Sequence, residues 1–229
     1  HKLLKEKDIL ISSQAKVICD IANTHLYQNT KVEYFAQGEA MHKKMIEELK
    51  KAKNFIFLEF FIIEEGIFWN SILEILKEKA TNKVEVKIIY DDIGCMTRLP
   101  GNYFKILKKY NIDCVIFSKL RGKANGEFNN RSHRKIAIID GTIGFTGGIN
   151  LADEYINEKE VYGKWKDTGI KMIGDAVNEN TKMFLSSFYL NKNNFNIFIT
   201  KIQTKTTLFW FFFNYHSIII KKKKKNVVN

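Results

Sequence analysis

The chain has 229 residues, of which 45% are hydrophobic and 27% charged, and its formal net charge is +12. This length and apolar content allow one sizeable core but are too small for two full domains. The three cysteines, Cys19, Cys95 and Cys114, form no C-x-x-C pair, which excludes a zinc-type spacing and argues against a disulfide framework. No apolar run reaches the roughly 18 to 20 residues that a membrane span needs.

From the N-terminus, helical and strand-like patterns alternate. They predict a helix at 14–24, a strand at 31–38, an amphipathic helix at 39–53, a strand at 54–63, a helix at 68–80 and a strand at 83–92. Beyond these they predict a helix at 101–110, a strand at 111–118, a hairpin around Asp140-Gly141, a strand at 165–174 and a helix at 175–190. The alternation favours one α/β domain over residues 1–190, with a mixed sheet flanked by helices on both faces.

Residues 191–229 differ from the rest of the chain. They contain eight lysines but no Gly, Ala, Pro, Asp, Glu or Arg, which leaves residues 1–190 a net charge of only +4. Most of the residue types used here have A/T-rich codons, so one interpretation is a slipped reading frame that produces a low-complexity tail foreign to the domain. The alternative is a membrane-surface segment, in which the apolar run 208–220 lies in the headgroup layer and the five lysines after it attract anionic lipid.

The residues best suited to chemistry lie in RSHRKIAIIDGTIGFTGGIN, residues 131–150. In a strand, side chains two positions apart point to the same face, so His133 and Lys135 should project together. The following apolar residues indicate a buried strand, where unpaired ionisable groups are costly unless they have a role. An imidazole can attack phosphorus or donate a proton, and an ammonium can neutralise phosphoryl oxygens. The pair therefore indicates a phosphate site.

Other residues of the same stretch and one outside it are candidates for this site. Asp140 could orient an imidazole or balance charge, but Asp-Gly is also a good turn dipeptide without any chemistry. Gly148 follows Gly147 and would let backbone approach a ligand closely. Asn150 offers an amide donor to an oxygen, or alternatively caps a helix starting at LADEY. Glu59 lies in an apolar run and needs a partner, which could be a cation of the site.

The spacing H-x-K-x(4)-D-x(6)-G-G-x-N resembles the signature of the phospholipase D superfamily. The surrounding segments narrow this to the first catalytic half of bacterial cardiolipin synthases over about residues 15–190, on the basis of LEFFII, EVKIIYDDIG, NNRSHRKIAIIDG, GFTGGINLADEY and WKDTGIKMIG. The resemblance implies a phospholipase D-like α/β fold. It also implies that catalysis needs no metal or other cofactor.

The resemblance also implies a role for each matching residue. His133 would be the nucleophile that forms a phosphatidyl-histidine intermediate, and Lys135 and Asn150 would hold the phosphate. Asp140 would support the site without attacking. Gly148 stands where many members of the superfamily have Ser. Asp167 matches a downstream acidic position that hydrogen-bonds a catalytic His, although an edge-strand Asp paired with Lys164 or Lys166 would look the same in the sequence.

This sequence departs from the family in one major respect. A full synthase carries two such motifs, and none of the other histidines here, His1, His25, His42 and His216, lies in an H-x-K frame. We therefore expect half of a site, in a fragment truncated near residue 190 that lacks the N-terminal membrane helices of such synthases. The missing half-domain, or a second copy of the chain, would be its partner.

The leading hypothesis is a phosphatidyltransferase that converts two molecules of phosphatidylglycerol into cardiolipin and glycerol. It would work at the bacterial cell membrane, with its site on the cytoplasmic side, and would have no nucleic acid partner, since the basic character of residues 1–190 is mild. The first alternative is a single-motif nuclease or phosphodiesterase that acts as a homodimer. The second is an inactive gene remnant. The sequence leaves the acceptor alcohol open.

Overall fold

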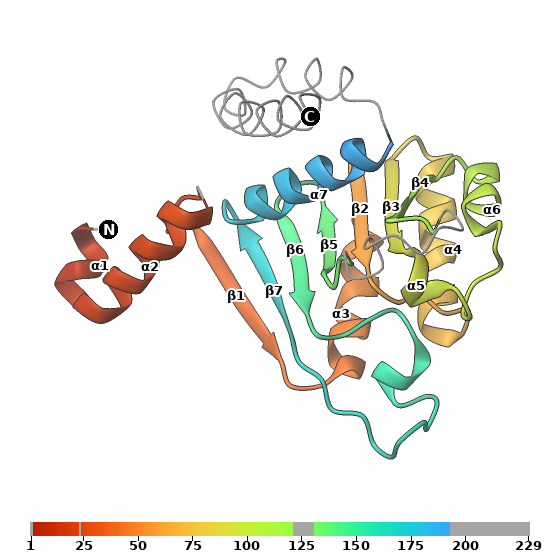
Figure 1. Ribbon diagram of the computed structural model, residues 1–229, viewed down its shortest axis with the longest axis horizontal. Coiled ribbons are helices and arrows are strands. Elements are labelled where there is room, and N and C mark those ends of the chain that lie inside the picture. Colours follow the sequence, from red (N-terminus) through yellow and green to blue (C-terminus); the bar gives the residue numbers. More distant parts are fainter. Residues whose placement is uncertain (1, 23, 121–130, 193–229) are drawn as a thin grey trace, which may run out of the picture. The chain divides into compact units, whose positions relative to one another are not determined.

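The computed structural model describes residues 2–22, 24–120 and 131–192 (Figure 1). Its first elements are α1 (Lys2–Lys7), α2 (Ile9–Ala22), β1 (Thr30–Phe35), α3 (Gly38–Leu49), β2 (Phe55–Phe60), α4 (Ile67–Thr81), β3 (Glu85–Asp91) and α5 (Asp92–Cys95). After these follow α6 (Tyr103–Lys109), β4 (Asp113–Phe117), β5 (Lys135–Ile139), β6 (Ile143–Gly147), the 3-10 helix η2 (Asp153–Ile156), β7 (Gly169–Gly174) and α7 (Val177–Asn191). The chain divides into two units between Phe184 and Leu185, and the account below concerns the first.

The strands form one mixed sheet in the order β1-β7-β6-β5-β2-β3-β4. Strands β2, β3 and β4 run parallel to one another, as expected where helices connect them, whereas β5, β6, β7 and β1 pair antiparallel. Strand β2 lies between β3 and β5, and five of its six residues are buried. The predicted hairpin at Asp140-Gly141 joins β5 to β6, and the predicted α/β mixed sheet is confirmed.

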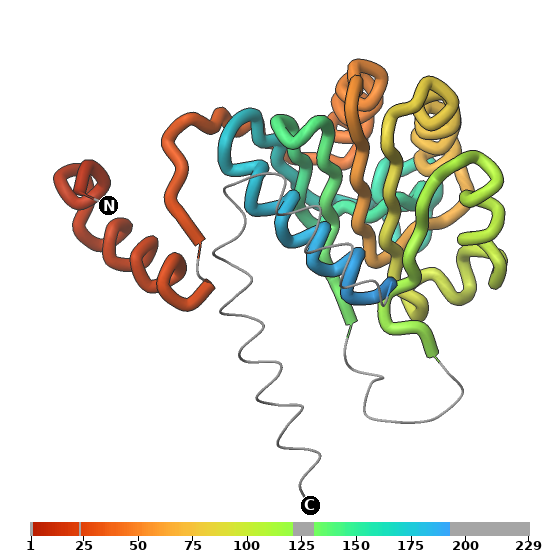
Figure 2. Tube along the Cα trace, turned by 90° about the horizontal axis from the view of Figure 1, so that it is seen from above, coloured from red at the N-terminus to blue at the C-terminus, as the bar shows by residue number. Residues whose placement is uncertain are grey.

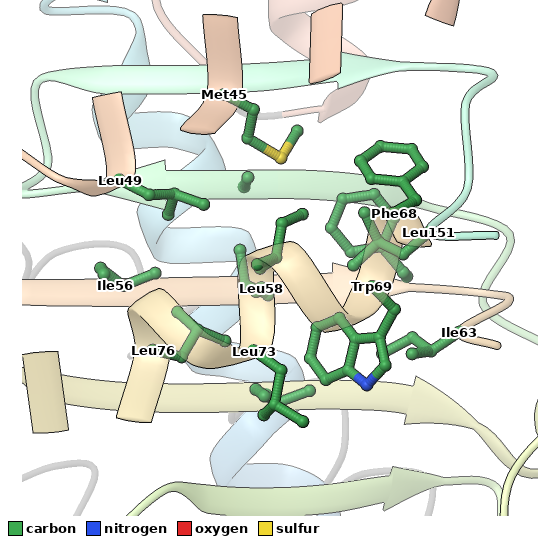
Figure 3. Close-up of a cluster of buried hydrophobic side chains, with 14 of the residues drawn as sticks. Met45, Leu49, Ile56, Leu58, Ile63, Phe68, Trp69, Leu73, Leu76 and Leu151 are labelled. Atoms are coloured by element: carbon green, nitrogen blue, oxygen red, sulfur yellow. The ribbon is translucent and has the colours of Figure 1, made fainter. Parts of the chain in front are cut away.

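Helices α3 and α4 cover one face of this sheet with a dense apolar core (Figure 3). Met45 and Leu49 of α3 and Leu73 and Leu76 of α4 pack over Ile56 and Leu58 of β2. At the N-terminal end of α4, the indole of buried Trp69 donates a hydrogen bond of 2.6 Å to the Tyr103 hydroxyl. Each such aliphatic side chain contributes roughly 1.5 to 3 kcal/mol when fully buried, so this layer fixes the position of β2.

Helix α7 begins on the opposite face of the sheet (Figure 2). The rings of Phe184 and Phe57 stack with centroids 4.9 Å apart and planes 9° from parallel. Gly144 of β6 leaves room for Val177, because a Cβ at that glycine would meet both methyl groups of Val177 at 3.4 Å. Helices therefore lie on both faces, as predicted.

The helix predicted at 14–24 begins earlier than its periodicity indicates and ends at Ala22. Helix α2 begins at Ile9 because the carboxylate of Asp8 accepts hydrogen bonds from the backbone N–H groups of Leu10 and Ile11, at 2.9 and 3.0 Å, and so caps its first turn. Of the expected tail at 191–229, everything beyond residue 192 lies outside the described residues. Over the part of the chain that is described, no helix combines the length and apolar character that crossing a bilayer requires.

Candidate active site

His133 and Lys135 meet at one end of the central strands, where β5 begins beside the end of β2. Lys135 is the first residue of β5 and pairs with Phe60, the last residue of β2. The His133 side chain is exposed, whereas Lys135 is only 3% exposed. The Lys135 ammonium lies 3.0 Å from Nδ1 of His133 and donates to the His133 carbonyl oxygen at 2.9 Å. The structure thus brings together the two residues that strand periodicity places on one face.

The ring of Phe61 lies against both residues of this pair. The centroids of the Phe61 and His133 rings are 4.8 Å apart, and Nζ of Lys135 lies 5.5 Å from the centre of the same Phe61 ring. Burial lowers the pKa of Lys135 from 10.5 to about 8, and the negative charge of Asp167 opposes that shift. Near neutral pH, Lys135 is therefore a weakly solvated cation, which favours an anionic ligand.

Asn150 is 2% exposed and is oriented by two hydrogen bonds. Its Oδ1 accepts from the Ile62 N–H at 3.0 Å, and its Nδ2 donates to the Tyr155 hydroxyl at 2.7 Å. An NH₂ group has two donors, and within the described residues only one of the two amide hydrogens has an acceptor. Asn150 does not cap a helix, because the N-cap residue of η2 is Ala152 and makes no side-chain cap bond. The cap alternative is therefore wrong.

Gly148 and Asp167 are pressed against each other. A Cβ at Gly148 would lie 2.0 Å from Oδ1 of Asp167, so only glycine allows this approach. The same Oδ1 accepts from the Thr168 N–H at 2.8 Å. Within the described ranges Asp167 forms no hydrogen bond to His133 and no ion pair with a neighbouring lysine, and it acts on the site through its charge on Lys135.

The structure does not bring Asp140 to this group. Asp140 follows the other end of β5, five positions from Lys135 or about 16 Å along an extended strand. Its carboxylate accepts from the N–H groups of Lys53, Asn54 and Phe55 at 2.7 to 2.9 Å, and these bonds lower its pKa against the effect of burial. The expectation that Asp140 orients the imidazole is therefore corrected, since its carboxylate ties the hairpin to the start of β2.

Glu59 also lies away from the pair. It is 1% exposed and pairs with Arg134 at 2.9 Å and with the Ser132 hydroxyl at 2.7 Å. In the sheet Glu59 pairs with Ile136, the neighbour of Lys135, so strand alternation points the Glu59 side chain to the opposite face from Lys135. Burial raises the pKa of Glu59 despite the guanidinium. The expected partnership with a cation of the site is thus corrected to one with Arg134.

Sequence reasoning missed two residues of this site, Phe61 and Tyr155. Phe61 lies in the LEFFII segment, but its role depends on where the chain turns after β2. Tyr155 is buried against Trp165, with ring centroids 4.9 Å apart, and five positions separate it from Asn150. An aromatic residue with a polar tip close after the Gly-Gly-x-Asn stretch was the available signal.

The arrangement suits nucleophilic chemistry on an anion. It offers an exposed imidazole, a buried ammonium beside it and an oriented amide. Over residues 2–22, 24–120 and 131–192, no three His, Cys, Asp or Glu side chains group in a way that could hold a metal ion.

Comparisons with known proteins identify the family of the chain. A family model described as "Cardiolipin synthase, PLD-like domain" matches residues 45–184. A Streptococcus mutans protein is 42% identical over 182 residues, which cover 80% of this chain and 40% of that protein. A cardiolipin synthase of Oceanobacillus iheyensis is 36% identical over 158 residues, which cover 69% of this chain and 33% of the relative. The chain thus spans two fifths or less of the length of these relatives.

Two solved structures share the fold. NucT from Helicobacter pylori has a TM-score of 0.53 at 17% identity and is matched over 97% of its chain and 71% of this one. Nuc from Salmonella typhimurium, a phospholipase D family member, has a TM-score of 0.52 at 17% identity, over 94% of its chain and 72% of this one. The family model covers more than half of the residues. The chain therefore belongs to the family of cardiolipin synthase, phospholipase D-like domains.

Proposed function

We propose that this chain carries one half of a phosphatidyltransferase site, which converts two molecules of phosphatidylglycerol into cardiolipin and glycerol. The observation that carries the proposal is the exposed imidazole of His133 within 3.0 Å of the buried Lys135 ammonium. The family membership supports the choice of a phospholipid over other phosphodiesters. In this proposal the chain works at the bacterial membrane, on the cytoplasmic side.

The first half-reaction forms a bond between a nitrogen of His133 and phosphorus and breaks the bond from phosphorus to the glycerol headgroup. Nδ1 of His133 faces Lys135, so Nε2 is the nitrogen that meets the substrate. While Lys135 donates to Nδ1, the ring proton sits on Nε2, and that atom has no lone pair to offer. The anionic diester draws the ammonium away, the proton moves to Nδ1, and Nε2 attacks.

Lys135 and Asn150 then hold the two non-bridging phosphoryl oxygens. The departing glycerol oxygen takes a proton from a second imidazole, which a second motif or a second copy of the chain supplies. In the second half-reaction, a hydroxyl of another phosphatidylglycerol attacks phosphorus and passes its proton to that imidazole. The bond from phosphorus to His133 breaks, and cardiolipin is released with atoms and charges balanced.

The first test uses phosphatidylglycerol labelled in its acyl chains, presented in mixed micelles. The purified chain should retain acid-labile label on protein, release glycerol and form labelled cardiolipin if a second imidazole is present. His133→Gln should abolish all three. His42→Gln is the matched control, because Nε2 of His42 is hydrogen-bonded to the Ser71 hydroxyl at 2.9 Å and the ring packs against that of Phe68. Label bound equally to wild type and to His133→Gln would overturn the proposal.

The second candidate function is that of a single-motif phosphodiesterase or nuclease that works as a symmetric dimer. The matched domain, residues 45–184, carries one H-x-K motif, and a symmetric dimer would bring two copies of that motif together. Bis(p-nitrophenyl) phosphate and single-stranded DNA are the discriminating substrates, with sedimentation to find the oligomer. Cleavage of DNA by a dimer, without label transfer from lipid, would select this candidate. A chain that is inactive in both assays and binds a hydrophobic dye would be the inactive gene remnant, the other alternative that the sequence leaves open.

A further inference from the structure

The backbone directly after β2 is held against the second part of the motif. The Ile62 N–H donates to Oδ1 of Asn150 at 3.0 Å, and the Ile62 carbonyl accepts from the Leu151 N–H at 3.2 Å. Ile63 and Leu151 form a parallel bridge. These contacts tie residues 62–63 to residues 150–151.

Helix α5 holds the other side of the same segment. A Cβ at Gly94 would lie 2.1 Å from the Phe61 carbonyl oxygen, so α5 packs directly on this backbone. Sγ of Cys95 accepts from the Ile63 N–H at 3.2 Å. Held between α5 and Asn150, the Phe61 backbone has little freedom to shift, and its side chain has a defined direction.

The Phe61 side chain reaches the first part of the motif. Its ring centroid is 4.8 Å from that of His133, with planes 49° apart, and it lies 5.5 Å from Nζ of Lys135. The face of an aromatic ring attracts a cation and prefers tilted contact with another ring. One side chain therefore touches both ionisable residues, while the backbone that carries it is bonded to Asn150.

We propose that Phe61 is a positioning residue that holds the His133 imidazole and the Lys135 ammonium in a fixed position relative to Asn150. The ring restricts rotation of the imidazole, so that Nδ1 stays on the lysine side and Nε2 faces the substrate. It also keeps the ammonium close to His133 in a place with few other polar partners. The inference rests on the proposed function for its catalytic consequence, whereas the geometry it assigns can be tested without turnover.

The test compares Phe61→Leu, which removes the aromatic face, with Phe61→Tyr, which keeps it. The matched control is Phe104→Leu, since Phe104 also has a lysine ammonium over its ring, that of Lys119 at 5.5 Å. The first readout is the ring-proton NMR shift of His133, assigned by its loss in His133→Gln. An imidazole beside an aromatic ring is shifted from its free position, so this readout needs no substrate.

Phe61→Leu should move the His133 signals toward free-histidine positions and slow single-turnover label transfer about tenfold, in line with roughly 1 to 1.5 kcal/mol for an aromatic and cation contact. The apparent lipid affinity should change less than twofold. Phe61→Tyr should retain both the signals and the rate. His133 signals unchanged in Phe61→Leu, or equal rate losses in Phe61→Leu and Phe104→Leu, would overturn the proposal. If dimeric wild type, in which the second copy supplies the second imidazole, transfers no label, the proposed function fails, and the NMR comparison still decides the geometry.

Discussion

Replacing Lys135 by Met should make the protein more stable and inactive at once. Lys135 is 3% exposed, and within the described chain it pairs with His133 and not with a carboxylate. Burial lowers its pKa from 10.5 to about 8. Since each pKa unit corresponds to about 1.4 kcal/mol, holding the charged form in the folded protein costs about 3 kcal/mol at pH 7.

Methionine has a similar length and no charge, so Lys135→Met removes that cost. It also loses the hydrogen bond to the His133 carbonyl, worth about 1 kcal/mol. We expect a net gain of about 2 kcal/mol and a rise in Tm of about 4 to 8 °C for a domain of this size. Urea and thermal unfolding followed by circular dichroism at pH 7 measure both, and label transfer from phosphatidylglycerol should be lost.

The pH dependence separates this cause from better packing. Below pH 8 the lysine is charged in the folded and the unfolded protein, so the full cost is present. Between pH 8 and 10.5 the unfolded chain still binds the proton and the folded protein has released it, so wild-type stability rises with pH relative to the variant. The advantage of Lys135→Met should therefore shrink over this range. An advantage that stays constant from pH 7 to 10, or a variant less stable than wild type at pH 7, would refute the reasoning.

Lys171→Met is the matched control, and it should have the opposite effect. Lys171 is as deeply buried, but its ammonium lies 2.9 Å from the carboxylate of Glu48 and 3.2 Å from that of Glu33. Its removal leaves Glu48 buried with a weaker partner, which costs about 3 kcal/mol. Equal effects of the two Lys→Met changes would mean that partners do not matter at these sites.

Other positions give expectations of different kinds. Label transfer by wild type should fall as pH rises through about 8, because Lys135 then loses its charge, and a constant rate from pH 7 to 9.5 would contradict its role. Asp140→Ala should cost about 3 kcal/mol of stability, since three N–H groups lose their acceptor and Ala must adopt a φ of 52°. The rate per folded molecule should stay unchanged. A variant that keeps its full stability but loses its rate would show that Asp140 acts in the site. Gly148→Ala should displace Asp167 and move the alkaline limb of the pH profile to lower pH, whereas Gly101→Ala, with nothing within 4 Å, should do neither.

Local periodicity accounts for what the sequence predicted correctly. A period of two places His133 and Lys135 on one face whatever the sheet around them, and the apolar run of β2 is buried on both sides in any α/β arrangement. Asp-Gly predicts its own hairpin. These features need only residues near one another in the chain.

The remaining parts depend on contacts between distant segments. Asp140 belongs to the motif by spacing, but only the pairing of β5 with β2 shows that its carboxylate meets the backbone at residues 53–55. Glu59 finds Arg134 because the register pairs Glu59 with Ile136. Phe61 reaches His133 only because the chain turns against Asn150 after β2. No pattern within one segment encodes such pairings.

The most direct measurement is the site and stoichiometry of the covalent intermediate. The chain is mixed with phosphatidylglycerol, and the reaction is quenched at alkaline pH. The protein is then digested, and the masses of its peptides are measured by mass spectrometry. We predict one phosphatidyl group per active site, carried by the peptide that contains His133 and absent from His133→Gln, while Phe61→Leu forms the same adduct more slowly. A phosphatidyl group on any other residue, or cardiolipin formed at an undiminished rate by His133→Gln, would contradict the account.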